Sequence, residues 1–276
     1  MFYRLGLIGQ NISYSLSPRI HEWGLKKLGL QGEYRLLDVS KDKVETLILK
    51  GEWDGLNITV PHKTLAAKYC AELSSIAEQV GAINVLYKKD VKICGDNFDG
   101  FGFKYALTKL NDNSREITSV LIIGSGGAAR AVIGEIQGAF PKSNVAVTSR
   151  NTSKVNSTFT AHQNNSFLSI ISFERAAANL SEFDLIIQAT PVGSHRIPGV
   201  PLPEPFSFSS RSLVMDLIYS PARTEFLLHA ERFGAIILNG LPMLLGQAAE
   251  SFRLWTGREF PIALAENELM PLLESR

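Results

Sequence analysis

The chain has 276 residues, 45% of them hydrophobic, so it can bury a sizeable core as one or two domains without disulfide or metal support. Its 28 lysines and arginines balance 27 aspartates and glutamates, and a net charge of +1 gives no reason to expect nucleic acid or an anionic membrane as a partner. Two cysteines and five histidines form neither a disulfide framework nor a metal-ligand pattern, and no apolar run reaches the ~18 residues of a membrane helix. We therefore expect a cytoplasmic protein that binds a small molecule.

The N-terminal part of the chain alternates between strand and helix patterns, which indicates an α/β domain with a mainly parallel sheet. Strands are predicted at 3–9, 34–39, 56–60, 82–87 and 91–96, and helices at 17–28, 43–49, 73–80 and 100–110. Ser17 is predicted to cap the first helix, because Pro18 follows at the first helical position. The serines before it, Ser13 and Ser15, suit either an ordinary polar loop or the binding of a polyhydroxylated ligand.

Polar side chains accompany the carboxyl ends of these strands. Asn57 and Thr59 alternate along the third strand and so point the same way. Lys63 follows just after that strand, at the edge where open α/β sheets bind ligands, although a lysine in such a place is by itself compatible with a solvated surface cation. Asp99 follows another strand and could equally cap the helix that begins at Gly100.

A glycine turn stands at the centre of the sequence, between a strand at 119–123 and a helical pattern. Gly124, Gly126 and Ala129 fit the GxGxxG/A form, in which small residues allow a tight turn, close approach to a pyrophosphate and close helix packing. Further strands are predicted at 144–148, 167–171, 184–188, 213–217 and 235–238. Six strands with helices between them predict a Rossmann-type, doubly wound dinucleotide-binding domain.

The residues after the second of these strands bear on the choice of cofactor. An NAD-specific domain has an acidic residue there for the ribose 2′-hydroxyl, but this chain has Ser149, Arg150, Asn151 and Lys154. Two cations with polar neighbours favour a 2′-phosphate and hence NADP, although they could also be solvated cations on a surface helix.

The C-terminal part adds a long loop and two helices. The loop at 190–212 is rich in proline and serine, and loops of this length are usually lids or binding loops. Helices are predicted at 241–255 and after Pro261, and they can return to the first domain. Met243 is interpreted as a core residue and Gln247 as exposed by default.

Seven ordered motifs together resemble the shikimate dehydrogenase family. They are SLSPRIH at 15–21, NITVPHK at 57–63, GAIN at 81–84, GDNFDGFG at 95–102, GSGGAARAV at 124–132, DLIYSP at 216–221 and NGLPMLLGQAAESFRLWTG at 239–257. The resemblance implies NADPH-dependent, reversible reduction of 3-dehydroshikimate to shikimate, in the pathway to aromatic amino acids. It implies a substrate domain at 1–103 and 241–276, an NADP-binding domain at 104–240, a cleft between them, and a homodimer as a possible assembly.

The resemblance also implies roles for individual residues. Lys63 and Asp99 would be the catalytic pair. Substrate would be bound by Ser15, Ser17, Asn57, Thr59, Lys63, Asn84, Asp99, Tyr219 and Gln247, with the two serines and the tyrosine on its carboxylate. NADP would be bound by Gly124, Ser125, Gly126, Gly127, Ala128, Ser149, Arg150, Asn151, Lys154, Thr190, Leu217, Gly240 and Met243.

Three positions depart from the family pattern. The family usually has arginine where this chain has Lys154, which implies a looser phosphate clamp. Phe98 and Val85 replace residues with hydroxyl groups, and a site that loses hydrogen-bond partners can lose discrimination between substrates. Quinate, or another relative of shikimate, therefore stays open as the substrate. A dehydrogenase for another substrate, such as methylenetetrahydrofolate, is a separate alternative. A nucleotide-binding relative without catalytic activity is a further alternative.

Overall fold

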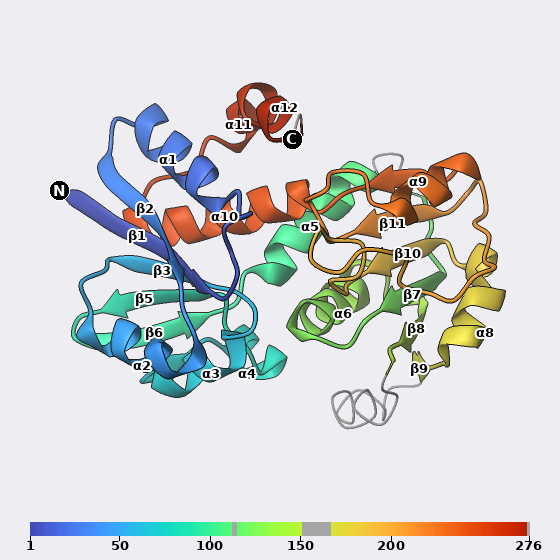
Figure 1. Ribbon diagram of the computed structural model, residues 1–276, viewed down its shortest axis with the longest axis horizontal. Coiled ribbons are helices and arrows are strands. Elements are labelled where there is room, and N and C mark those ends of the chain that lie inside the picture. The colour runs from blue at the N-terminus through green and yellow to red at the C-terminus, as the bar shows by residue number, and fades with distance from the viewer. Residues whose placement is uncertain (112–114, 151–166, 275–276) are drawn as a thin grey trace. The chain divides into compact units, whose positions relative to one another are not determined.

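The computed structural model describes residues 1–111, 115–150 and 167–274, and the chain forms two compact units (Figure 1). Unit 1 comprises Met1–Gly102 and Leu244–Ser275, and unit 2 comprises Phe103–Met243. The chain passes from one unit to the other within two helices, α5 (Asp99–Leu110) and α10 (Leu241–Thr256). Among the described residues, no helix combines the length and the apolar character that spanning a membrane requires.

Unit 1 is built on a six-stranded sheet with the order β2-β1-β3-β5-β6-β4. Its strands are β1 (Phe2–Gly9), β2 (Gln31–Asp38), β3 (Gly55–Ile58), β4 (Glu72–Leu73), β5 (Val85–Lys89) and β6 (Lys92–Asp96). β1 pairs with β2 and β3 in parallel, as predicted, whereas β5 is antiparallel to both β3 and β6. The prediction of a mainly parallel sheet is confirmed, with β5 as its antiparallel strand, because a tight turn with Asp90 at a φ of 57° joins β5 to β6 without a crossover helix.

Helices cover both faces of this sheet (Figure 1). They are α1 (Ser17–Lys27), α2 (Lys41–Lys50), α3 (Lys63–Ala66), α4 (Ser75–Val80), α10, α11 (Ile262–Glu268) and α12 (Met270–Glu274), with a 3₁₀ turn η1 (Ala67–Tyr69) after α3. On one face, α2 and α3 pack over buried residues such as Ile8, Leu56 and Ile58. On the other face, His21 of α1 packs among aromatic rings that include Phe252 of α10. From Leu244 on, the C-terminal helices are thus part of unit 1.

The start of α1 differs from the prediction. The N-cap is Leu16 rather than Ser17, and the Leu16 side chain makes no capping hydrogen bond. Ser17 is the first helical residue, and its backbone N–H donates to the Ser15 hydroxyl at 3.2 Å. The cap prediction is therefore wrong by one residue, and it is the Ser15 hydroxyl that accepts from an amide of the first turn.

Unit 2 is built on a second six-stranded sheet, with the order β12-β11-β10-β7-β8-β9 and every pairing parallel. Its strands are β7 (Ser119–Ile123), β8 (Asn144–Thr148), β9 (Leu168–Ile170), β10 (Leu185–Gln188), β11 (Leu213–Asp216) and β12 (Ile236–Leu238). The chain order reverses between β7 and β10, which is the switch point of a doubly wound dinucleotide-binding fold. The Rossmann-type prediction is confirmed.

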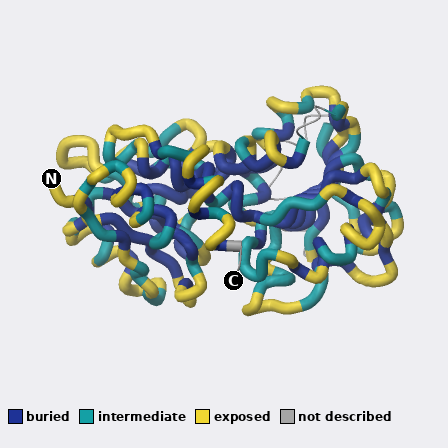
Figure 2. The backbone as a smooth tube through the Cα atoms, turned by 90° about the horizontal axis from the view of Figure 1, so that it is seen from above, coloured by how far each residue is buried: buried dark blue, intermediate teal, exposed yellow. Residues whose placement is uncertain are grey.

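Strand periodicity divides the core of unit 2 into two layers. Val120 and Ile122 of β7 face a cluster that includes α5 and α6 (Gly127–Ala139), whereas Leu121 and Ile123 face a cluster with α8 (Phe173–Ala178) and α9 (Glu225–Arg232). The four central strands β7, β8, β10 and β11 are buried over nearly all of their residues (Figure 2), whereas the edge strands β9 and β12 are only partly buried. The second cluster also contains Leu202, Phe206 and Phe208. The long loop at 190–212, predicted to be a lid or a binding loop, therefore packs into the core over its second half.

Candidate active site

Lys63 and Asp99 form an ion pair in unit 1. The Lys63 ammonium donates to Oδ2 of Asp99 at 2.5 Å, and the two side chains are 18% and 9% exposed. Lys63 begins α3 directly beyond the carboxyl end of β3, and Asp99 begins α5 beyond β6. Asp99 could also have been a helix cap. Instead, its two carboxylate oxygens accept hydrogen bonds from side chains of other elements. Partial burial weakens the screening of the pair by water.

Two asparagines hold Asp99 in place. The Asn84 amide donates to Oδ1 of Asp99 at 2.8 Å, and its carbonyl oxygen accepts from the backbone N–H of Phe98 at 2.8 Å. The Asn97 side chain accepts from the backbone N–H of Asp99 at 3.0 Å and donates to the carbonyl of Ala82 at 2.9 Å. The carboxylate therefore has a fixed orientation, with one oxygen on Asn84 and the other on Lys63.

The predicted carboxylate-binding serines are close together. The Ser15 hydroxyl donates to the Ser17 hydroxyl at 3.2 Å, and Ser17 is 4% exposed. The loop that carries them leaves β1 at the same edge at which β3 ends, because these strands are adjacent and parallel. A backbone bond of 3.2 Å from Gln10 to Val60 joins the two loops there. Ser15, Ser17 and Lys63 thus follow strands that end at one edge of the sheet.

Three other predicted substrate residues are partly or almost fully buried. Thr59 lies just beyond β3, half-buried, and its backbone N–H donates to the carbonyl of Ile8 at 2.9 Å. Gln247 was predicted to be exposed, but only 9% of it is accessible to solvent. Its amide donates to the carbonyl of Leu244 on its own helix at 3.1 Å. Asn57 is 3% exposed, and protein groups take both of its amide hydrogens.

In unit 2 the glycine turn has the geometry of a phosphate cradle. Gly124 has a φ of +125°, and a Cβ there would lie 2.9 Å from the carbonyl oxygen of Ala189, so only glycine fits without strain. Gly126 has an ordinary φ of −78°, and a Cβ there would meet nothing within 4 Å. The open space in front of Gly126 and the N-terminus of α6 fit the close approach of a pyrophosphate. The residues present therefore fit the pyrophosphate of a dinucleotide cofactor.

The residues predicted for the 2′-phosphate are only partly described. The Ser149 hydroxyl, at the end of β8, accepts from the hydroxyl of Ser125 in the glycine turn at 3.3 Å, and Arg150 is exposed. Asn151 and Lys154 lie outside the described residues. In the described part of the chain, the half-buried Arg130 of α6 has a buried Nε without a hydrogen-bond partner, and burial lowers its pKa.

The residues predicted for the nicotinamide end follow β10, β11 and β12. The Thr190 backbone N–H donates to the buried Gln188 side chain at 2.5 Å. Leu217 and Gly240 are adjacent, since a Cβ on Gly240 would lie 2.1 Å from the Leu217 carbonyl oxygen. Met243 is 8% exposed and packs in the core cluster under α5 and α6, as its interpretation as a core residue requires.

A buried carboxylate organises the loop that carries Leu217 and Tyr219. Asp216 accepts from the backbone N–H of Ile218 at 3.0 Å and from the Thr224 hydroxyl at 2.7 Å, and Thr224 in turn caps α9. Burial raises the pKa of Asp216 to about 7, and these two hydrogen bonds oppose the rise. Sequence reasoning missed Asp216, because an acid at the end of a buried strand gives no local sign of its partners.

Comparison with known proteins relates both ends of the chain to one family. Residues 7–86 match the shikimate dehydrogenase substrate binding domain, and residues 240–270 match the shikimate 5'-dehydrogenase C-terminal domain. The NADP(+)-dependent shikimate dehydrogenase of Bacillus licheniformis is 37% identical over 261 residues, which is 92% of this chain and 91% of that protein. The chain belongs to the shikimate dehydrogenase family.

Solved structures of this family resemble the whole chain. A crystal structure of a shikimate dehydrogenase in complex with NADP+ has a TM-score of 0.87 at 30% identity, and the match covers 99% of this chain and 96% of that one. The quinate dehydrogenase of Corynebacterium glutamicum, in complex with NAD, has a TM-score of 0.83 at 26% identity, with 96% and 97% covered. The α/β fold with two parallel-rich sheets is thus the fold of shikimate dehydrogenases.

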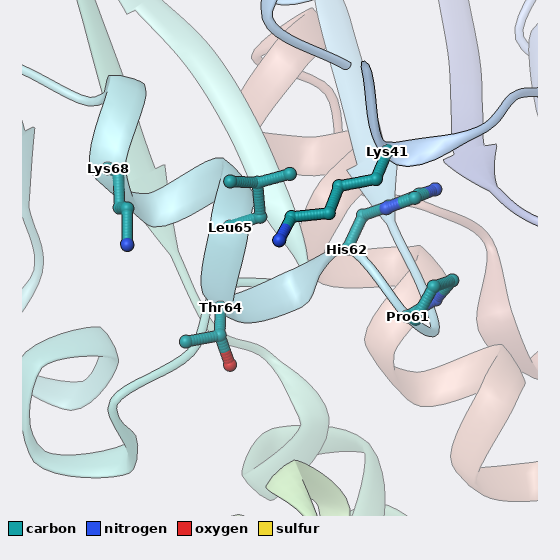
Figure 3. A pocket seen from close by; sticks show the side chains of 6 residues that line it. All are labelled: Lys41, Pro61, His62, Thr64, Leu65 and Lys68. Carbon is teal, nitrogen blue, oxygen red and sulfur yellow. The ribbon is translucent and has the colours of Figure 1, made fainter. Parts of the chain in front are cut away.

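A separate hollow lies beside α3 in unit 1. It has a volume of about 290 Å³ and is lined by Lys41, Pro61, His62, Thr64, Leu65 and Lys68 (Figure 3). In Figure 3 the Lys41 side chain extends toward α3 and ends next to Leu65. Neither Lys63 nor Asp99 lines this hollow, so it is distinct from the position of the ion pair.

Proposed function

We propose that the protein catalyses the reversible, NADPH-dependent reduction of 3-dehydroshikimate to shikimate, with Lys63 as proton donor and Asp99 as its orienting partner. The observation that carries the proposal is the 2.5 Å ion pair between these residues, held by Asn84, in a chain of the shikimate dehydrogenase family. NADPH, when bound, would supply the hydride. The chain's own residues then have to bind and orient the substrate and to move one proton.

Lys63 suits the proton transfer by its chemistry and its surroundings. Its ammonium group carries three donors, so it can give a proton to the ketone oxygen during reduction while its charge stabilises the developing alkoxide. In the reverse direction the neutral amine takes the proton back from the alcohol. Asp99 holds the ammonium through one oxygen, and its other oxygen is fixed by Asn84, which restricts the directions in which Lys63 can point.

The remaining site residues have proposed binding roles. The Ser15 and Ser17 hydroxyls, 3.2 Å apart, suit the two oxygens of the substrate carboxylate, and Tyr219 is proposed to assist them. Ring hydroxyls are assigned to Thr59, Asn84, Asp99 and Gln247. NADP is assigned to Gly124, Ser125, Gly126, Gly127 and Ala128 for its pyrophosphate, to Ser149, Arg150, Asn151 and Lys154 for its 2′-phosphate, and to Thr190, Leu217, Gly240 and Met243 for its nicotinamide end.

The decisive experiment replaces Lys63 and a matched lysine. Loss of a general acid–base should lower kcat of Lys63→Ala by 10²- to 10⁴-fold, as measured by the absorbance of NADPH formed from shikimate and NADP+. Lys68→Ala is the control, because Lys68 is an exposed cation on the next turn of the same segment. A Lys63→Ala enzyme that keeps kcat within about tenfold of the wild type removes Lys63 from the proton-transfer role.

Quinate is the second candidate substrate. Phe98 and Val85 lack the hydroxyls that the family commonly has at these positions, and a relative of the same fold is named a quinate dehydrogenase. Removing hydrogen-bond partners weakens discrimination between related hydroxy acids. Values of kcat/KM for shikimate and quinate, each with NADP+ and NAD+, separate the two functions. A larger value for quinate with NAD+ would refute the proposed assignment.

We further propose that the protein is cytoplasmic and assembles as a homodimer. Two free cysteines and a balanced charge suit a reducing compartment without an anionic surface as partner. Cell fractionation tests the location, and light scattering of the purified protein tests the assembly.

A further inference from the structure

The Asn57 side chain is committed to the interior of unit 1. Its oxygen accepts from the Tyr34 hydroxyl at 2.7 Å, and its amide nitrogen donates to the carbonyl of Asn84 at 3.2 Å and to the Ser251 hydroxyl at 3.0 Å. The orientation of this amide follows from its partners, since a carbonyl can only accept and the Ser251 hydrogen is already donated to the carbonyl of Gln247 at 2.9 Å. Only one acceptor position of Asn57 is left for any other group.

The three partners come from distant elements. Tyr34 lies on β2, Asn84 just before β5 and Ser251 on α10, and the bond to Ser251 spans 194 positions of the sequence. Tyr34 is 3% and Ser251 is 0% exposed, so water does not compete for these hydrogen bonds. Asn57 therefore ties the helix that carries Gln247 to the segment that carries Asn84.

Asn84 connects this arrangement to the ion pair. Its backbone carbonyl is held by the Asn57 amide and by the backbone N–H of Ile58 at 2.8 Å. Its side chain holds Oδ1 of Asp99 at 2.8 Å, and Asp99 holds Lys63. A displacement of the Asn84 backbone therefore shifts the carboxylate that orients the lysine.

We propose that Asn57 is a positioning residue that acts through Asn84 on the Asp99–Lys63 pair, with Tyr34 and Ser251 as its supports, rather than a ligand of the substrate's ring hydroxyls. The kinetic part of this inference rests on the proposed function. The hydrogen bonds of Asn57 with Tyr34, Ser251 and Asn84 are called the bridge here. Tyr34→Phe and Ser251→Ala test the proposal most directly, because each removes one hydroxyl from the bridge and neither residue is assigned to the substrate or to NADP.

Tyr3→Phe is the matched control. The Tyr3 hydroxyl is also directed at α10, at 3.5 Å from the carbonyl of Thr256, but it has no connection to Asn84. Tyr34→Phe and Ser251→Ala should lower kcat about tenfold with KM for shikimate unchanged within about twofold, because small displacements of a catalytic group cost rate rather than binding. Tyr3→Phe should keep both values within about twofold of the wild type.

A second measurement needs neither substrate nor cofactor. The rate of Lys63 acetylation by acetic anhydride, followed by mass spectrometry relative to Lys68 in the same molecule, reports how firmly Asp99 holds the ammonium. Weakening the charge-assisted bond should raise this rate at least about threefold in Tyr34→Phe and Ser251→Ala, but not in Tyr3→Phe. A wild type without turnover would refute the proposed function and leave this test of the bridge intact.

Two results would overturn the proposal. One is unchanged Lys63 acetylation in both bridge variants, together with kcat within about twofold of the wild type if the enzyme is active. The other is an Asn57→Ala enzyme whose KM for shikimate rises about tenfold or more at unchanged kcat, which is the behaviour of a residue that only binds substrate.

Discussion

Acid should destabilise unit 1 through one buried histidine. His21 is 0% exposed, its ring is stacked on Tyr34 with centroids 4.4 Å apart, and neither of its nitrogens has a hydrogen-bond partner among the described residues. Burial lowers the pKa of His21 to about 3, an effect that the neighbouring Asn57 side chain offsets only in part. The histidine therefore stays neutral in the folded protein at any pH well above 3.

The size of the effect follows from proton linkage. In the unfolded chain His21 regains a pKa of 6.5, so below that pH the unfolded state binds a proton that the folded state does not. Each pH unit below 6.5 then costs about 1.4 kcal/mol of the free energy of unfolding. At pH 5 the loss is about 2 kcal/mol, and it continues to grow until the pH approaches 3.

His21→Phe removes the titration while keeping a ring against Tyr34. The free energy of unfolding is measured in urea at pH 7 and pH 5 for both proteins, with tryptophan fluorescence as the signal. All three tryptophans, Trp23, Trp53 and Trp255, belong to unit 1, so the signal reports on the unit that contains the substitution.

The decisive quantity is the change of the stability difference between variant and wild type with pH. Groups that both proteins share cancel in this difference, and a packing defect caused by phenylalanine adds an offset that does not depend on pH. We expect the difference to shift by about 2 kcal/mol in favour of the variant on going from pH 7 to pH 5. Parallel pH dependences of the two proteins would show that His21 is not held neutral by burial.

Two further predictions concern unit 2. Asp216 should give the opposite pH dependence, because a carboxyl whose pKa is raised to about 7 stabilises the folded state in acid and loses this contribution as the pH rises through 7. Asp216→Asn should therefore gain about 2 kcal/mol or more relative to the wild type between pH 5 and pH 7, as measured by hydrogen exchange of β11. Gly126→Ala should leave the melting temperature nearly unchanged but weaken NADP+ binding at least about tenfold by calorimetry, whereas Gly124→Ala should cost about 1–3 kcal/mol of stability. Equal effects of the two alanines on stability would contradict this division of roles.

Local patterns were sufficient to predict much of the fold. The strand at 119–123, its glycine turn and the following helix are visible in the sequence because strand periodicity, turn chemistry and helix periodicity change within a few residues. The antiparallel pairing of β5 with β3 was not predictable in the same way. It depends on the path of the chain through α3 and α4, whereas the antiparallel pairing of β5 with β6 follows from the short turn at Asp90.

The ion pair and the residues that support it were likewise only partly predictable from local sequence patterns. Lys63 and Asp99 are separated by 36 positions, and only their place at strand ends and their resemblance to a family brought them together in the sequence. Nothing local distinguishes them from a surface cation and a helix cap. A substrate role for Asn57 follows only from the family resemblance, and the sequence gives no sign of its hydrogen bonds to Tyr34, Asn84 and Ser251, which are distant in the chain.

Burial of polar groups is the property that a single sequence conceals most completely. Asn57 and Asp216 stand in apolar strands and His21 stands in a helix of mixed polar and apolar residues, and their residue types alone favour exposure or a site. What decides their roles is how many hydrogen-bond positions the surroundings fill. Asn57 has nearly all of its hydrogen-bond positions filled, which favours a structural role. His21 finds no hydrogen-bond partner within the part of the chain that the structure describes, so it can be buried only as a neutral ring. Since those partners come from strands and helices far away in the chain, the two roles become distinguishable only when the packed structure is considered.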